Sequence, residues 1–134
     1  MIHLDTHVLV WLYGGDVEEL SDAARALVET EDLFASPMAV LELDFLHEIR
    51  RTTVTGRTVV DDLGPRIGLR VATTPFAVII ERAAGLLWTR DPFDRVIVAN
   101  ALADGARLLT RDRTILKHVD SALWDREKPK RRRR

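Results

Sequence analysis

The sequence predicts an α/β fold in which a parallel sheet is covered by helices on both faces. Its 134 residues, 46% of them hydrophobic and 31% charged, suit one globular domain with a core of its own. Short apolar segments alternate along the chain with longer segments of helical periodicity. Strands that are separated by helices are joined by right-handed crossovers, which makes the strands parallel and places helices on the faces of the sheet.

Five short segments are the predicted strands, and each is three or four residues long and mostly apolar. They are IHL (2–4), LFAS (33–36), LRVA (69–72), RLLT (107–110) and, least regular of the five, ALW (122–124). The working site of an open parallel sheet lies beyond the carboxyl ends of its strands. Asp5 and Asp112, which lie just past two of these segments, therefore become candidate site residues.

The helices are predicted from capping residues and from apolar spacing. A Ser, Thr or Asp side chain before a helix accepts hydrogen bonds from its first N–H groups, and a glycine often ends it. By these signals the helical segments are 6–15, 20–30, 37–51, 53–68, 74–87, 91–105 and 112–119. The predicted N-caps are Ser21, Ser36, Thr74 and Asp91.

The charge is unevenly distributed. The tail 128–134 holds 6 of the 20 basic residues, so residues 1–127 carry 14 basic against 21 acidic side chains, a net charge of −7. We expect 1–127 to be the domain and the tail to be a disordered extension. An acidic body is not typical of a simple nucleic-acid binder, but it can hold several carboxylates around a metal ion.

The composition also narrows the cellular setting. The chain has no cysteine, which excludes disulfides and thiolate metal sites and fits the reducing cytoplasm. No apolar stretch approaches the length of a membrane span, and the N-terminus does not have the pattern of a signal peptide.

Four acidic residues border apolar sequence, and each has both a functional and a structural interpretation. Asp5 and Asp112 are N-caps or site residues, and Asp94 is favoured by the dipole of its helix or lies at the mouth of the core. Asp91 precedes Pro92 and is better explained as a cap. Glu42 is expected to share an inward helix face with four apolar residues, or else to pair with an arginine. That apolar set is Met38, Leu41, Phe45 and Ile49.

A cluster of these carboxylates favours a bound cation. Like charges raise one another's pKa, and a hard divalent ion such as Mg²⁺ removes the conflict because it prefers oxygen ligands. The four histidines form no metal-ligand motif, and His7 is expected to be a packed or surface side chain.

Four pieces of the chain form a family pattern. They are LDTHVLVWL with Asp5, SPMAVLELDFLHEI with Glu42, RDPFDRVIVANALADGA with Asp94 and RLLTRDRTI with Asp112. In order and spacing they resemble the PIN-domain ribonucleases, specifically the toxin subunit of VapBC-type toxin–antitoxin modules. The likeness covers nearly the whole chain, and DPFDR with LLTRD is its most specific pair. The tail 128–134 is not part of the pattern.

The resemblance implies an α/β/α sandwich on a parallel sheet of about five strands, and endonucleolytic RNA cleavage that depends on Mg²⁺ or Mn²⁺. Such cations activate water and neutralise charge on the scissile phosphate. The catalytic and metal-binding residues that it implies are Asp5, Glu42, Asp94 and Asp112. Asp91 matches an additional acid of this subgroup, and Thr6 and Thr110 match positions where the family often has a hydroxyl.

The resemblance also implies partners. A small antitoxin would block the acidic groove with its C-terminal segment, and the toxin would form a homodimer. Four apolar residues either line the antitoxin groove or belong to the core, which is the ordinary place for such side chains. They are Val8, Trp11, Leu12 and Leu46.

Two other functions compete with the nuclease. In the first, the acids are only caps and surface charges, and the domain is a non-catalytic module that binds RNA or a protein partner. In the second, Asp5 is the nucleophile of an aspartyl-phosphate phosphatase. That chemistry requires a second acid where this chain has His7.

Overall fold

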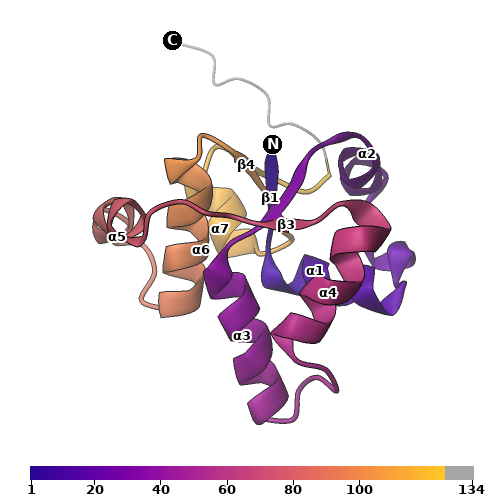
Figure 1. Ribbon diagram of the computed structural model, residues 1–134. Helices are drawn as coiled ribbons and strands as arrows, with labels where there is room; N and C mark the ends of the chain where they lie inside the picture. Colours follow the sequence, from indigo (N-terminus) through magenta and orange to yellow (C-terminus); the bar gives the residue numbers. More distant parts are fainter. Residues whose placement is uncertain (126–134) are drawn as a thin grey trace.

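A five-stranded parallel sheet forms the middle of the domain (Figure 1). The computed structural model describes residues 1–125, so the predicted basic tail at 128–134 lies outside the described residues. The strands are β1 (Ile2–Leu4), β2 (Leu33–Ala35), β3 (Arg70–Val71), β4 (Arg107–Leu109) and β5 (Ala122–Leu123), in the spatial order β3-β2-β1-β4-β5. The predicted α/β/α class is confirmed, although every strand except β1 is one or two residues shorter than the segment that predicted it.

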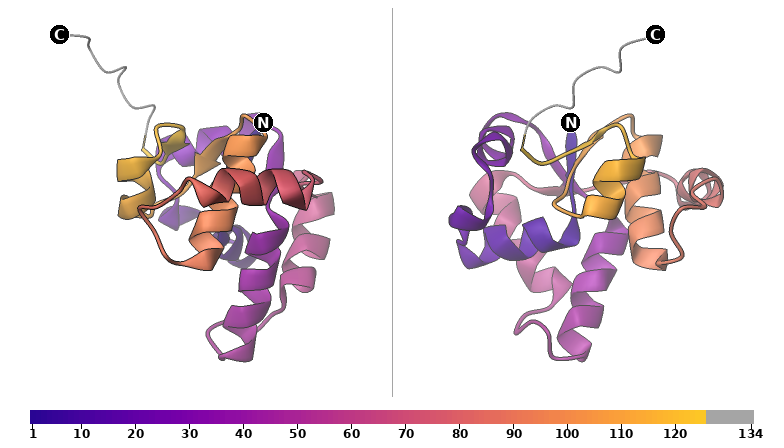
Figure 2. Two further views of the ribbon diagram at one scale, coloured as in Figure 1. Left: turned by 90° about the vertical axis from the view of Figure 1, so that its left-hand side faces the viewer. Right: turned by 180° about the vertical axis from the view of Figure 1, so that it is seen from behind.

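Residues 1–125 form seven α-helices and one short 3₁₀ turn, η1 (Val17–Glu19), which the sequence did not predict. The helices are α1 (Thr6–Gly14), α2 (Asp22–Thr30), α3 (Pro37–Glu48), α4 (Gly56–Ile67), α5 (Phe76–Ala84), α6 (Pro92–Ala103) and α7 (Arg113–His118). Figures 1 and 2 show α1, α2 and α4 on one side of the sheet and α5, α6 and α7 on the other, with α3 extending from its carboxyl edge. None of these helices is long and apolar enough to cross a lipid bilayer.

The central strands β1 and β4 supply the middle of the core. Ile2, Leu4, Leu108 and Leu109 are fully buried, as expected for strands that have helices on both faces. Because these strands cannot shift without exposing that surface, the residues that directly follow them are held at fixed positions along the carboxyl edge of the sheet.

The predicted cap at Thr74 is wrong. Helix α5 begins after Pro75, and Thr74 Oγ1 instead donates to Asp104 Oδ1 at 2.6 Å. Asn100 Nδ2 donates to Thr74 Oγ1 at 2.8 Å and to Asp104 Oδ2 at 3.3 Å, and His3 Nε2 lies 2.8 Å from the same Oδ2. This cluster links β1 to the start of α5 and the end of α6, and it explains the single polar residue in the apolar run of α6.

Helix α3 ends three residues earlier than predicted. It stops at Glu48, because Arg50 adopts a left-handed conformation with φ of 61°. The chain then folds back, and the N–H groups of Arg51 and Thr52 both donate to the carbonyl of Leu46, at 2.8 and 3.4 Å. This turn sets the position of the Arg51 side chain.

The predicted inward face of α3 is also wrong. The face that packs against the core is formed by Ala39 and Leu43, which are 0% and 1% exposed. Glu42 is half-buried, and of the four apolar residues expected beside it Met38 does pack against the core, whereas the other three are at the surface. They are Leu41, Phe45 and Ile49, which are 53%, 42% and 47% exposed.

Helix α4 begins unusually close to α3. A Cβ atom at Gly56 would lie 2.3 Å from the carbonyl oxygen of Val40, a distance that real Cβ atoms do not reach. The N–H of Gly56 also donates to Asp44 Oδ1 at 2.8 Å. Glycine at this position therefore lets the two helices meet, and it fixes the connecting loop beside the end of α3.

Candidate active site

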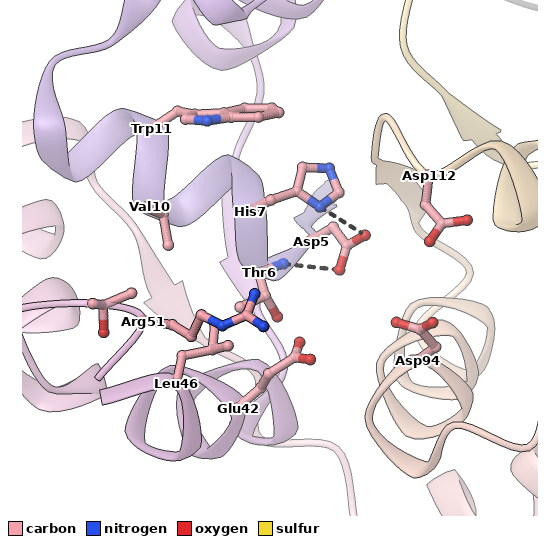
Figure 3. Close-up of a pocket in the computed structure, with 11 residues that line it drawn as sticks. Asp5, Thr6, His7, Val10, Trp11, Glu42, Leu46, Arg51, Asp94 and Asp112 are labelled. Atoms are coloured by element: carbon pink, nitrogen blue, oxygen red, sulfur yellow. Dashed lines mark hydrogen bonds and ion pairs between the residues drawn. The ribbon is translucent and has the colours of Figure 1, made fainter. Parts of the chain in front are cut away.

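A pocket of about 350 Å³ opens at the carboxyl edge of the sheet (Figure 3). It is formed by the first turns of α1, the middle and end of α3, the first turn of α6 and the segment before α7. The residues that line it are Asp5, Thr6, His7, Val10, Trp11, Glu42, Leu46, Arg51, Thr52, Asp94 and Asp112. The pocket thus brings together the four acids that the sequence singled out.

Asp5 is the most firmly held of these acids. It follows β1 directly and is 3% exposed. Its Oδ1 accepts a hydrogen bond from the N–H of Thr6 at 2.8 Å, and its Oδ2 accepts one from Thr110 Oγ1 at 2.6 Å. Thr110 is fully buried and is not among the residues that line the pocket, so it acts by orienting Asp5.

Asp112 caps a helix and also lines the pocket. Its Oδ1 accepts hydrogen bonds from the N–H groups of Thr114 and Ile115, at 2.8 and 3.0 Å, and so caps α7. Its own N–H donates to Thr110 Oγ1 at 3.0 Å. Because the cap uses one carboxylate oxygen, Asp112 can also present an oxygen to the pocket, which it lines (Figure 3).

Asp91 is an N-cap and does not line the pocket. Its Oδ1 accepts hydrogen bonds from the N–H groups of Phe93 and Asp94, at 2.9 and 3.2 Å, and the residue is exposed. The structure therefore places Asp91 at the start of α6, one turn from Asp94, where its charge still acts on the pocket.

Asp94 lies in the first turn of α6 and faces the pocket (Figure 3). Its pKa is raised from 3.8 to about 7, first because the carboxyl group is partly buried and then because nearby carboxylates repel its charge. In decreasing order of effect these carboxylates are Asp91, Asp5, Asp112 and Glu42. The crowding of negative charge is thus strongest at Asp94.

Glu42 projects into the same pocket from α3 (Figure 3). Burial raises its pKa above the ordinary value, the nearby Thr6 hydroxyl offsets part of the rise, and the charges of Asp5 and Asp91 add to it. The carboxyl groups of Glu42 and Asp94 are therefore both more easily protonated than they would be in water.

The chemistry of these side chains fits a hard divalent cation. Glu42, Asp94 and Asp112 form no ion pair with any described basic side chain. Within residues 1–125, no three His, Cys, Asp or Glu side chains are placed to bind one ion directly. Mg²⁺ suits such a site because it retains several waters and needs only one or two protein carboxylates.

His7 is a packed imidazole, as expected, with its ring against that of Trp11, and it also lines the pocket. Its Nε2 accepts a hydrogen bond from the N–H of Arg111 at 3.0 Å, so the proton of the neutral ring is on Nδ1. Nδ1 lies 3.6 Å from Asp5 Oδ2. Burial is the main cause of the lowered pKa of His7. The charge of Arg111 lowers this pKa further, whereas the charges of Asp5 and Asp112 raise it.

Four apolar residues were expected to lie either in the core or in a groove for the antitoxin, and the structure places two in the core and two at the pocket. Val8 and Leu12 are buried in the core, whereas Trp11 and Leu46 are partly exposed and line the pocket. The position of His7, two residues after Asp5 in the first turn of a helix, was a signal that could have identified it. Arg51 had no such signal, because it reaches the pocket only through the turn that ends α3.

Comparisons with known proteins agree with this architecture. The family described as PIN domain matches residues 2–121. Ribonuclease VapC22 of Mycobacterium tuberculosis is 30% identical over 118 residues, which cover 86% of this chain and 89% of that protein.

Two solved structures have a similar fold. A toxin–antitoxin complex from Klebsiella pneumoniae matches with a TM-score of 0.68 and 17% identity, over 96% of this chain and 100% of that chain. VapBC2 from Rickettsia felis, bound to a DNA fragment from its promoter, matches with a TM-score of 0.60 and 18% identity, over 93% and 100%. At this level of identity, the two matches show the fold alone.

The raised pKa of Asp94 predicts a stability penalty in the metal-free protein. The folded state binds more protons than the unfolded chain between pH 3.8 and about 7, so stability falls as the pH rises through this window. Asp94→Asn removes the penalty. In EDTA at a pH of about 8 we expect it to stabilise the protein by about 1 kcal/mol, a modest figure because the carboxyl group is partly solvated.

Urea unfolding at several pH values measures this difference. The gain from Asp94→Asn should shrink towards pH 4, and Asp61→Asn, at an exposed position of α4, should show no such trend. A stability difference between wild type and Asp94→Asn that does not vary with pH would contradict the assignment.

Proposed function

The chain belongs to the PIN domain family, as its sequence motifs predicted, and from this premise we propose that it is a divalent-metal-dependent endoribonuclease and the toxin of a toxin–antitoxin pair. Its relative of 30% identity is a ribonuclease, and that relative aligns along most of both chains. The proposal places the enzyme in the cytoplasm, with its RNA substrate.

One observation carries the proposal: four carboxylates from four separate segments line a single pocket. Each acid alone is explained by helix capping or surface charge. Their convergence, with the pKa of two of them raised, is not explained by capping. In the proposal Asp5, Glu42, Asp94 and Asp112 form the catalytic site and hold Mg²⁺ or Mn²⁺, one or two of them directly and the others through bound water, whereas Asp91 caps α6.

The protein's part in the reaction is to hold oxygen atoms at fixed positions. Thr110 orients Asp5 through the 2.6 Å hydrogen bond to Oδ2, and the Nδ1–H of His7 faces the same oxygen. The N–H groups at the start of α7 fix Asp112. A divalent cation held by these carboxylates supplies activation of a water molecule and neutralisation of charge on the scissile phosphate.

The catalytic role of the pocket is tested by Asp94→Asn. The substitution keeps the size of the side chain and removes its charge, so we expect RNA cleavage with Mg²⁺ to fall by at least about 100-fold. Asp61→Asn is the matched control and should cleave like wild type. The assay is cleavage of labelled single-stranded RNA with Mg²⁺ or EDTA, with circular dichroism to check the fold. Activity that persists in Asp94→Asn, or in EDTA, would overturn the acidic pocket as a metal-dependent catalytic site, whereas a wild-type protein that does not cleave RNA would leave the non-catalytic module.

The proposed antitoxin is a small protein that covers the acidic pocket. The partly exposed Trp11 and Leu46 at its wall provide apolar contacts for such a segment. We expect growth arrest when the chain is expressed alone, and relief when the neighbouring small reading frame is co-expressed. Growth arrest that is the same with and without that frame counts against the partner. Asp94→Asn is the control: if it no longer arrests growth, the arrest comes from RNA cleavage and not from overexpression of the protein.

The proposed homodimer uses the apolar face of α3. Leu41, Phe45 and Ile49 are exposed there, and Phe45 stacks on Phe93 of α6 with ring centres 5.5 Å apart. We expect Phe45→Lys to halve the mass measured by light scattering, because a buried lysine charge would oppose association. Val17→Lys, at an exposed position of η1, is the control. A wild-type protein that is monomeric at high concentration would overturn the dimer.

A further inference from the structure

A second cavity adjoins the acidic pocket. It also has a volume of about 350 Å³, and it lies between α1, α3 and the loop that connects α3 to α4. Val10, Arg51 and Thr52 line both cavities, so they form the wall that the two share. An RNA strand that leaves the acidic pocket on this side therefore passes Arg51 first.

Arg51 is unusual because it is a cation among carboxylates and pairs with none of them. Its guanidinium group points into the acidic pocket on the side of Glu42 (Figure 3). Among the described residues, no carboxylate lies within 4.0 Å of it, and it forms no hydrogen bond through its side chain. The left-handed turn at Arg50 holds it there, and left-handed conformations of residues other than glycine have an energetic cost.

The walls of the second cavity are suited to a nucleoside. Tyr13 and Val54 provide partly exposed apolar surface, Thr52 and Thr53 provide hydroxyl groups, and Asp16 and Arg50 are the charged residues of the lining. Nucleobases have apolar faces, which pack on aromatic side chains, and polar edges, which form hydrogen bonds. The cavity, at about 350 Å³, is larger than a single aromatic ring requires.

We propose that this second cavity binds the nucleotide next to the cleavage site, and that Arg51 binds the phosphate between that nucleotide and the scissile bond. The inference rests on the proposed function, because it places the scissile phosphate in the acidic pocket. The planar guanidinium group suits a phosphate, which accepts two parallel hydrogen bonds from it. Arg51 is thus a substrate-positioning residue. Its positive charge helps an otherwise acidic pocket to attract RNA.

The test compares Arg51→Gln with Arg51→Lys and with Arg82→Gln. Arg82 lies on α5, on the far side of the molecule from α1 and α4, and controls for the loss of one positive charge (Figure 1). We expect Arg51→Gln to raise KM for a short single-stranded RNA about tenfold, the size of one charge-assisted hydrogen bond, with kcat changed less than about twofold. Arg51→Lys should recover part of the loss.

A second measurement separates phosphate binding from a structural role. Binding of the same RNA to the Asp94→Asn protein, followed by fluorescence anisotropy, weakens with salt in proportion to the number of phosphates neutralised. Arg51→Gln should reduce the slope of log Kd against log salt concentration by about 0.7. Arg51→Lys should retain the wild-type slope, because it retains the charge, and Arg82→Gln should match wild type.

The outcomes distinguish this inference from the proposed function. If the wild-type protein neither binds nor cleaves RNA, both fail. If it cleaves RNA, but Arg51→Gln has the KM and salt slope of Arg82→Gln, the nucleotide subsite alone is overturned. If Arg51→Gln leaves RNA binding unchanged and weakens only the antitoxin, the cavity binds protein rather than a nucleotide.

Discussion

The repulsion among carboxylates in one pocket is the constraint on which the account depends. Burial and neighbouring charges raise the pKa of Asp94 to about 7, so this arrangement is costly for the metal-free protein near neutral pH. A fold selected for stability alone would move one of these acids into solvent. The domain instead holds Asp5 and Asp112 in the segments that follow β1 and β4, and it holds Glu42 and Asp94 on α3 and α6.

Two of the three acids that cap helices beside the pocket, Asp5 and Asp112, also line it. Asp5, Asp91 and Asp112 precede α1, α6 and α7, and each accepts hydrogen bonds from backbone N–H groups at the start of its helix. The positive ends of three helix dipoles therefore face the acidic region and favour its charge. Capping and metal binding are thus compatible functions of one carboxylate, since a cap can use one oxygen and leave the other available.

The sequence was a good guide wherever a local rule determined the structure. Strand positions, most caps and the face of α6 that buries Ile97 and Val98 followed from periodicity and capping. Prediction failed where a distant segment decided the outcome. Thr74 bonds to Asp104 instead of capping α5. Leu41, Phe45 and Ile49 face solvent because the other side of α3 packs on the core.

Among the residues that line the pocket, the sequence analysis named the four acids, Thr6, Trp11 and Leu46, but not Arg51. Asp5, Glu42, Asp94 and Asp112 each stood beside apolar sequence, and this was a visible signal. Glu42 was placed correctly for a wrong reason, because the helix face expected to carry it inward is exposed. Arg51 depends on the backbone of Arg50, and no propensity predicts a left-handed arginine.

The most direct measurement of the central claim is the location of a metal ion. Crystals of the protein grown with Mn²⁺ can be examined for anomalous scattering at the manganese edge. We expect one or more peaks inside the pocket, within about 2.2 Å of an oxygen of Asp5, Glu42, Asp94 or Asp112, with water completing the coordination. A well-ordered crystal with Mn²⁺ in excess, and no peak between these four residues, would contradict the account.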